Sequence, residues 1–159
     1  MAGISIRNLT RRPTPRLPYD AALRRVLPGW EVSLVFVGPA EARALNERLR
    51  GKAYVPNVLS YAAGTRSGEI IICLAEAGRQ APAYGVDARM FVLYLLIHGL
   101  LHLKGVPHGA TMERSERGHL ARLAKGVVRN YSSLHGSTNR NRHRHRHAPG
   151  QAGRRRRTR

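Results

Sequence analysis

The chain has 159 residues, a formal net charge of +19 and a single cysteine, Cys73. This length suits one domain with a buried core, and one cysteine excludes a disulfide framework and fits a reducing cytoplasm. The apolar run 90–103 is shorter than the ~20 residues that a membrane-spanning helix needs, and the N-terminus lacks a signal-peptide core. We therefore expect a cytoplasmic protein with no membrane partner.

The positive charge is unevenly distributed along the chain. Residues 137–159 contain nine arginines and no acidic residue, which leaves +10 of the +19 on residues 1–136. We expect a folded domain over residues 1–136 and a disordered, basic Arg/His-rich tail over residues 137–159. A body this basic favours a polyanionic partner, with RNA, DNA and anionic membrane as candidates and membrane the weakest of them.

Hydrophobic patterning and turn residues predict the elements of the first half of the chain. In order, they are an edge strand at 4–8, a proline-interrupted loop at 11–18, a helix that Asp20 caps and that ends near Leu27, a strand at 30–37 and a helix at 40–50. Pro39 suits the first turn of the last helix, because the N–H that proline lacks is not used there.

The second half is predicted to contain two more strands and three helices. They are strands at 57–61 and 69–74 joined by a turn, a helix at 75–84, a long helix capped by Asp87, and an amphipathic helix at 111–131 with Thr111 as its cap. The helix after Asp87 is apolar nearly all round from Phe91 to Leu101, so we expect it to be central and buried. The fold class is therefore α+β, with a small mixed sheet packed on helices around this central helix.

Three histidines, His98, His102 and His108, lie within the segment HGLLHLKGVPH. Residues four apart on a helix share one face, and Gly105 allows the chain to turn back before His108. Three imidazoles can occupy three corners of a tetrahedral zinc site and leave the fourth open, as in catalytic sites. Neutral imidazole also suits zinc better than calcium or magnesium. We predict these histidines as ligands of one Zn²⁺ per chain, whereas buried core histidines are the simpler alternative.

Zinc in such a site favours hydrolysis. The spacing H-x-x-x-H-x-x-G-x-x-H matches the zinc motif of the metzincin peptidases, but those enzymes need a glutamate directly after the first histidine. Here that position is Gly99, so a metallopeptidase is the least favoured alternative. A phosphodiester fits a basic body better, and RNA supplies its own 2′-hydroxyl as an internal nucleophile.

Several basic residues are candidates for contact with such a substrate. Arg50 is the predicted catalytic residue, because a guanidinium can hold phosphate oxygens in a bidentate fork. The tail can act as a sequence-independent electrostatic arm on RNA. Residues predicted to contact RNA, for which a solvated surface is the plainer alternative, are Arg48, Lys52, Arg154, Arg155, Arg156 and Arg157.

Three ordered blocks of the sequence resemble the YbeY family of zinc-dependent bacterial endoribonucleases. They are NERLRGKAYVPNVLSY, GEIIIC and HGLLHLKGVPH. The resemblance extends from about Leu34 to Leu123. It implies a zincin-like fold, with His98, His102 and His108 as zinc ligands and Arg50 facing the metal cleft. It also implies single-strand-preferring cleavage in 16S ribosomal RNA maturation and quality control, with ribosomal RNA and the small ribosomal subunit and its proteins as partners.

Three positions depart from the family pattern. Pro107 stands where the family usually has an aspartate before the third histidine, Pro56 replaces a threonine before Asn-Val-Leu-Ser, and Glu69 replaces an aspartate after Gly68. The missing aspartate matters because a carboxylate partner orients a ligand histidine. These departures keep open a non-catalytic RNA-binding ribosome-assembly factor as an alternative. Glu69 is a candidate for the cleft or a plain strand-end carboxylate, and no general base is identified.

Overall fold

The computed structural model describes residues 2–127, and the predicted tail lies outside them. The elements, in chain order, are β1 (Gly3–Asn8), α1 (Tyr19–Val26), β2 (Glu31–Val37), α2 (Pro39–Arg50), β3 (Val58–Gly64), β4 (Ser67–Cys73), α3 (Leu74–Gln80), the 3₁₀ helix η1 (Ala81–Tyr84), α4 (Ala88–Leu103), α5 (Ala110–Leu123) and the 3₁₀ helix η2 (Ala124–Gly126). The predicted α+β class is confirmed.

The four strands form one mixed sheet in the order β1-β2-β4-β3. β1, β2 and β4 run parallel, whereas β3 pairs antiparallel with β4, so β1 lies at an edge as predicted. β3 extends to Gly64 and β4 begins at Ser67, which makes the connecting turn shorter than the sequence suggested. Each parallel pair requires a crossover connection. α1 lies in the connection between β1 and β2, and α2 lies in the connection between β2 and β4.

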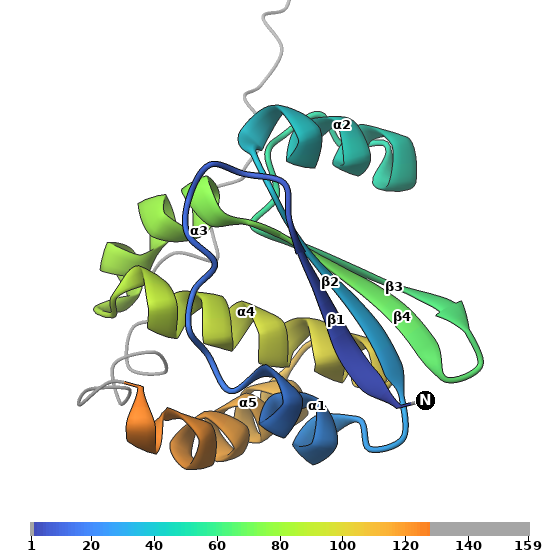
Figure 1. Cartoon of the computed structure of the whole chain (residues 1–159), viewed down its shortest axis with the longest axis vertical. Coiled ribbons are helices and arrows are strands. Elements are labelled where there is room, and N and C mark those ends of the chain that lie inside the picture. The colour runs from blue at the N-terminus through green and yellow to red at the C-terminus, as the bar shows by residue number, and fades with distance from the viewer. Residues whose placement is uncertain (1, 128–159) are drawn as a thin grey trace, which may run out of the picture.

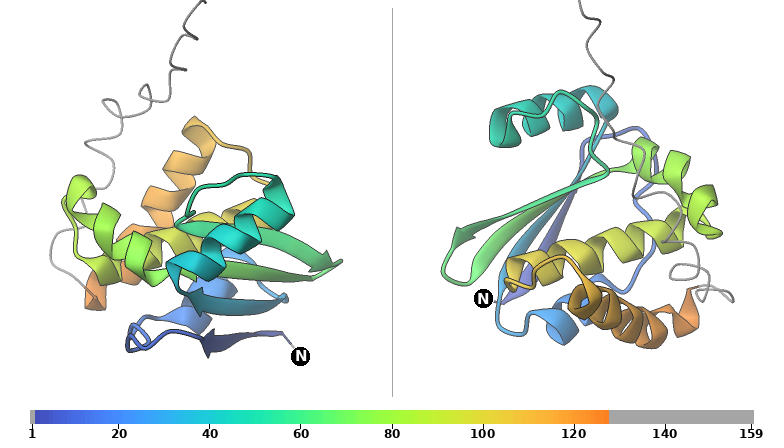
Figure 2. Two further views of the ribbon diagram at one scale, coloured as in Figure 1. Left: turned by 90° about the horizontal axis from the view of Figure 1, so that it is seen from above. Right: turned by 180° about the vertical axis from the view of Figure 1, so that it is seen from behind.

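Helices cover both faces of the sheet unequally. α4, α1 and α5 lie on one face, and α2 alone lies against the other, near one end (Figures 1 and 2). Alternate residues of β2 and β4 point to opposite faces, so each strand contributes to both cores. The larger core includes Leu34, Phe36, Ile70 and Ile72, and the smaller one under α2 includes Val35, Val37, Ile71 and Cys73. Cys73 is therefore a small buried apolar residue.

The helix α4 is the central buried helix that its composition predicted. Asp87 caps it by accepting a hydrogen bond from the Met90 N–H at 2.8 Å. Ten of its sixteen residues are buried, all within the stretch from Met90 to Leu101. Among the described residues no single helix has the length and hydropathy to cross a bilayer. The segments Leu74–Tyr84 and Ala88–Leu103 have that length and hydropathy only when they are taken together, and they are bent by 104° at their junction.

Some helix ends differ from the predictions. The caps proposed at Asp20 and Thr111 are wrong, because both residues lie inside the first turn, after Pro18 and Gly109 as the cap residues. The expected helix 75–84 is split into α3 and η1, since Pro82 has no N–H to continue an α-helical ladder. α5 is followed by η2, and the rest of the helix predicted to residue 131 lies outside the described residues.

A leucine pair tests how strongly α4 depends on burial. Leu96 has no exposed surface, whereas Leu49 on α2 is 46% exposed. We expect Leu96→Ala to lower the free energy of unfolding by about 3 kcal/mol, because it leaves a cavity, and Leu49→Ala to lower it by less than about 1 kcal/mol. Urea denaturation of both variants measures the difference. Similar losses at both positions would contradict the core assignment of α4.

Candidate metal centre

The structure brings His98, His102 and His108 into one cluster. One potential ligand atom from each lies within 4.8 Å of the others, and the Nε2 atoms of His98 and His102 are 3.0 Å apart. Tetrahedral zinc with Zn–N bonds of 2.0–2.1 Å separates two ligand nitrogens by about 3.3 Å. Three imidazoles at this spacing fit a zinc ion with small adjustments of the rings.

Local structure accounts for the convergence of the three rings. His98 and His102 are one turn apart at the end of α4, and packing of the helix limits their movement. Gly105 then adopts a left-handed conformation with φ of 85°, which a residue with a Cβ adopts at a cost. The N–H groups of Gly105 and Val106 bond back to the carbonyls of His102 and Leu101, at 2.9 and 3.0 Å. This Schellman turn directs the exposed His108 back toward the other two rings.

A buried glutamate on α5 orients the first histidine. Glu116 is only 2% exposed, and its Oε1 lies 2.6 Å from Nδ1 of His98. A carboxylate that accepts the Nδ1 proton leaves Nε2 unprotonated and turned toward the cluster, which is the arrangement found behind many zinc-ligating histidines. The chain thus has a carboxylate partner for a ligand histidine, although the exposed Pro107 replaces the aspartate that the resemblance led us to look for.

The sequence analysis missed Glu116, yet the sequence contains a signal for it. Met112, Glu116 and Leu120 follow one another at intervals of four residues and are the buried residues of α5. A carboxylate on the apolar face of an amphipathic helix requires a partner, because an unpaired buried charge is costly. The place of Glu116 on this buried face therefore predicts a polar contact inside the fold. Its partner became evident only from the docking of α5 on α4.

The environment of the cluster keeps its central ring neutral. Burial, together with electrostatic repulsion from His98, His108 and Arg50, lowers the pKa of His102 to about 4. At neutral pH the imidazole of His102 therefore has a free lone pair, which is the form that binds a metal. The contribution of Arg50 also indicates that its guanidinium lies near the histidines.

The histidines open into a cleft of about 800 Å³ between α4, β3 and the end of α2. Its lining residues are Leu49, Arg50, Asn57, Val58, Leu59, Ser60, Tyr61, Ala62, His98, His102, Leu103 and His108. None of these described lining residues is acidic. The cleft thus combines nitrogen ligands with one permanent positive charge, a set suited to an anionic substrate.

The position of Arg50 follows from the way α2 ends. Gly51 terminates the helix in a left-handed conformation, and the N–H of Lys52 bonds to the Asn46 carbonyl at 3.3 Å. The buried side chain of Asn46 also holds the following loop by donating from Nδ2 to the Tyr54 carbonyl at 3.0 Å. The last helical residue, Arg50, consequently lies at the edge of the cleft.

At Gly99, where the metzincin peptidases have their glutamate, α4 packs closely against the sheet. A Cβ built on Gly99 lies 3.1 Å from the side chain of Ile70, because α4 closely approaches β4 there. A side chain at this position would require Ile70 to move by a few tenths of an ångström. The peptidase alternative therefore lacks its glutamate, at a position where the packing is tight.

The other predicted contact residues lie elsewhere. Arg48 and Lys52 are exposed and do not line the cleft, so their contact with RNA stays a prediction. Glu69 is also outside the cleft, opposite Tyr61 in the sheet. The pKa of the Tyr61 hydroxyl is raised first by burial and then by its interaction with Glu69. Arg154, Arg155, Arg156 and Arg157 lie outside the described residues. Sequence analysis did not single out Asn57 or Tyr61 as lining residues.

Substitution of Glu116 tests its role behind His98. We expect Glu116→Gln to weaken zinc binding about tenfold and Glu116→Ala up to about a hundredfold, since Gln still offers an acceptor and Ala offers none. Glu47→Gln, which changes a half-exposed carboxylate on α2, is the control and should bind zinc like the unaltered chain. Competition with a chromophoric chelator measures each affinity. Equal affinities in all four proteins would contradict an orienting role.

Comparison with known proteins agrees with this fold. The family model described as Endoribonuclease YbeY matches residues 16–131. Endoribonuclease YbeY of Aromatoleum aromaticum is 34% identical over 117 residues, covering 72% of this chain and 76% of that protein. The Pseudomonas fluorescens Pf-5 protein of the same name is 32% identical over 141 residues, covering 77% and 93%. The solution structure of TM1509 from Thermotoga maritima, 20% identical, covers 76% of this chain and 89% of its own with a TM-score of 0.57, and so shares the fold. The chain belongs to the YbeY family.

Proposed function

We propose that the chain is a zinc-dependent endoribonuclease that cleaves single-stranded ribosomal RNA in the cytoplasm, during maturation and quality control of the small ribosomal subunit. The observation that carries the proposal is the cleft in which three convergent histidines and Arg50 meet without an acidic residue among the described lining residues. The relatives named endoribonuclease support the reaction class.

In this proposal each residue has a separate task. His98, His102 and His108 hold the zinc, and Glu116 keeps the Nε2 of His98 directed toward it. Zinc bound there supplies Lewis-acid stabilisation of charge on a phosphoryl oxygen. Arg50 binds the same phosphodiester through its guanidinium and stabilises the negative charge that develops in the transition state. The absence of a carboxylate base from the described lining agrees with the use of the ribose 2′-hydroxyl as the nucleophile.

Tyr61 supports the preference for single strands. It is 36% exposed, lines the cleft and lies on β3 opposite Glu69 of β4. An aromatic ring on a strand of the sheet is a surface on which an unpaired base can stack, whereas bases in a duplex already stack on their neighbours. A single-stranded segment can thus place one base on Tyr61 and its phosphodiester between Arg50 and the histidines.

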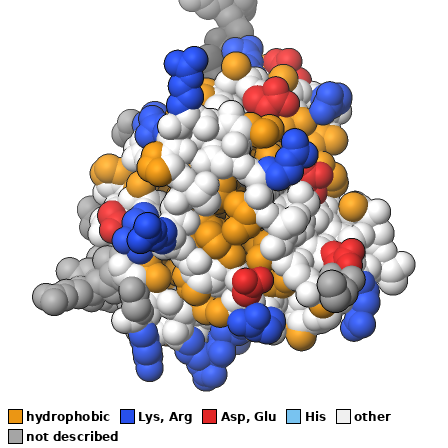
Figure 3. Space-filling model, viewed as in Figure 1, with side chains coloured by type: hydrophobic (Ala, Val, Ile, Leu, Met, Phe, Trp, Pro, Cys, Tyr) orange, Lys and Arg blue, Asp and Glu red, His pale blue; other side chains and the backbone are white. Residues whose placement is uncertain are grey.

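The distribution of charge favours RNA as the partner. Lysine and arginine side chains are spread over the face in Figure 3, and residues 137–159 add nine arginines without an acidic residue. A net positive field attracts a polyanion without base specificity, and Arg154, Arg155, Arg156 and Arg157 add to it at the far end of the chain. Selection of a particular site then depends on the cleft and on proteins of the small subunit.

Removal of one predicted zinc ligand tests the proposal. We expect His102→Ala to abolish RNA cleavage and to bind one zinc per chain fewer than the unaltered protein. The difference between the two proteins cancels zinc bound by His143, His145 and His147 of the tail. Elemental analysis and a gel assay on single-stranded RNA give both results. A non-catalytic assembly factor would bind RNA in both proteins and cleave in neither, and cleavage that survives in the variant would end the proposal.

Two arginines that are two residues apart on α2 test the phosphate contact. Arg50 lines the cleft and Arg48 does not, although both are exposed near the end of α2. We expect Arg50→Ala to lower kcat/KM for RNA about 100-fold or more, because it removes transition-state stabilisation, and Arg48→Ala to change it less than about threefold. Arg50→Lys should recover only part of the rate, since lysine has no bidentate fork. Equal losses for Arg50→Ala and Arg48→Ala would assign both residues to general attraction instead.

A further inference from the structure

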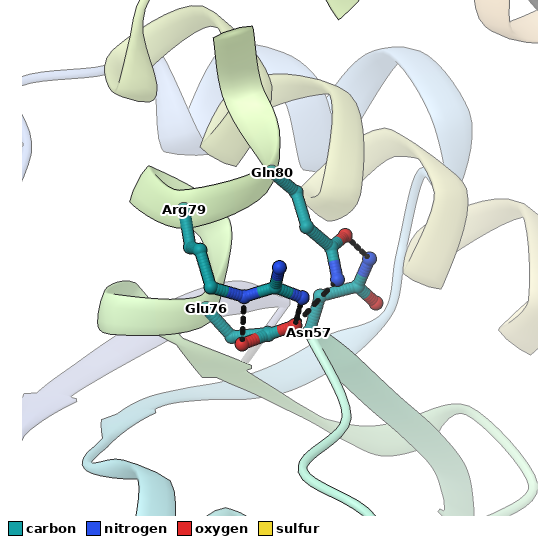
Figure 4. A network of polar contacts seen from close by, with 4 residues as sticks. All are labelled: Asn57, Glu76, Arg79 and Gln80. Carbon is teal, nitrogen blue, oxygen red and sulfur yellow. Dashed lines mark hydrogen bonds and ion pairs between the residues drawn. The ribbon is translucent and has the colours of Figure 1, made fainter. Parts of the chain in front are cut away.

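A chain of polar contacts ends at the cleft residue Asn57 (Figure 4). Arg79 donates to both carboxylate oxygens of Glu76, at 2.5 and 3.0 Å. Gln80 donates from Nε2 to Glu76 at 2.7 Å, and Asn57 donates from Nδ2 to Oε1 of Gln80 at 2.8 Å. The Asn57 carbonyl of the backbone also accepts from the Cys73 N–H at 3.0 Å, which holds this residue beside the end of β4.

The chemistry of Glu76 determines the direction of every amide in this chain. The hydrogen bond from Arg79 lowers the pKa of Glu76, so the carboxyl is ionised at neutral pH and can only accept. Gln80 must therefore turn its NH₂ group toward Glu76 and its carbonyl oxygen toward Asn57. Asn57 must in turn present its own NH₂ group to Gln80. Its side-chain oxygen, Oδ1, is left pointing away from the network.

The Oδ1 atom of Asn57 is available to a ligand. It has no hydrogen bond with any described residue, and it is not among the buried polar atoms that lack a partner. Because Asn57 is half-buried at the wall of the cleft, the orientation of its amide is restricted while one acceptor remains open. The same cleft holds Arg50 and the three histidines.

An amide oxygen accepts a hydrogen bond and cannot donate one, which limits what it can recognise. Phosphate oxygens are also acceptors and are excluded as its partner. The donors in RNA are the 2′-hydroxyl of every ribose and the N–H groups of the bases. The 2′-hydroxyl lies next to the phosphodiester whatever the base is, and it is the group that distinguishes RNA from DNA.

We propose that Asn57 is a specificity-determining residue, whose Oδ1 accepts a hydrogen bond from a ribose 2′-hydroxyl and thereby selects RNA over DNA. Arg79, Glu76 and Gln80 are positioning residues that act through the amide of Asn57. This inference rests on the proposed function, because it takes the cleft as the site where RNA binds.

The test compares three fluorescent oligo(U) strands that carry 2′-hydroxyl, 2′-amino or 2′-fluoro groups. The first two groups can donate a hydrogen bond and fluorine cannot, and uracil has no exocyclic amine. Anisotropy titrations of the full chain, at a salt concentration of about 0.3 M to screen the tail, give the ratio of affinities for donor and fluoro strands. One hydrogen bond of ordinary strength predicts about fivefold tighter binding of the donor strands.

Two variants and a matched control separate recognition from folding. We expect Asn57→Ala and Glu76→Gln to reduce the ratio to about one, the second because a glutamine at position 76 no longer fixes the direction of the two amides. Glu47→Gln breaks a more exposed ion pair on one helix, with Arg43 and outside the cleft, and should keep the ratio of the unaltered chain. Thermal unfolding checks each variant. If Asn57→Ala does not fold, Glu76→Gln, which leaves Asn57 in place, decides the outcome.

Each result counts for or against the inference. A ratio that persists in Asn57→Ala or in Glu76→Gln overturns it. The inference is also overturned if the donor and fluoro strands of oligo(U) bind equally well while Asn57→Ala weakens the binding of oligo(A). In that case the donor that Asn57 recognises is an amine of the base. If the chain prefers the donor strands but cleaves no RNA, the result supports this inference and rejects the proposed nuclease. If the chain cleaves RNA but binds donor and fluoro strands equally, the result rejects this inference and supports the proposed nuclease.

Discussion

Burial of α4 against the sheet is the constraint on which the rest of the site depends. The helix meets β4 so closely at Gly99 that a Cβ there lies 3.1 Å from the side chain of Ile70. Close packing limits both rotation and sliding of the helix. The last turns of α4 therefore hold His98 and His102 in one orientation relative to β3. A metal site made of side chains on a mobile segment would lose this preorganisation.

The site also shows how a buried charge is tolerated in a small domain. Glu116 is removed from solvent, and isolated burial of a carboxylate is strongly unfavourable. Its contact with His98 offsets part of that cost, and the same contact fixes which nitrogen of the ring faces the cleft. The stabilising partner and the orienting partner are thus one residue. α5 contributes to the candidate metal centre without lining the cleft.

Local sequence signals predicted the parts of the site that depend on local structure. The all-round apolar pattern of α4, the four-residue spacing of His98 and His102, and the turn at Gly105 each act within a few residues of the chain. Partners set by tertiary docking were not predictable in the same way. The contact of Glu116 with His98 depends on how α5 packs, and the link between Asn57 and Gln80 spans 23 residues and two elements. Helix starts were shifted by a residue or two for a simpler reason, because several neighbouring residues can serve as caps.

The distance along the chain between the parts of the centre has a further consequence. Arg50 comes from α2, two imidazoles from the end of α4, the third from the turn after it, and the carboxylate from α5, the last long helix of the described part. The complete constellation forms only when these segments have docked on one another. Partly folded chains, or fragments cut before α5, retain individual donors but not their common geometry. Assembly of the candidate site is in this way tied to completion of folding, so an unfinished molecule lacks the full set of groups in one place.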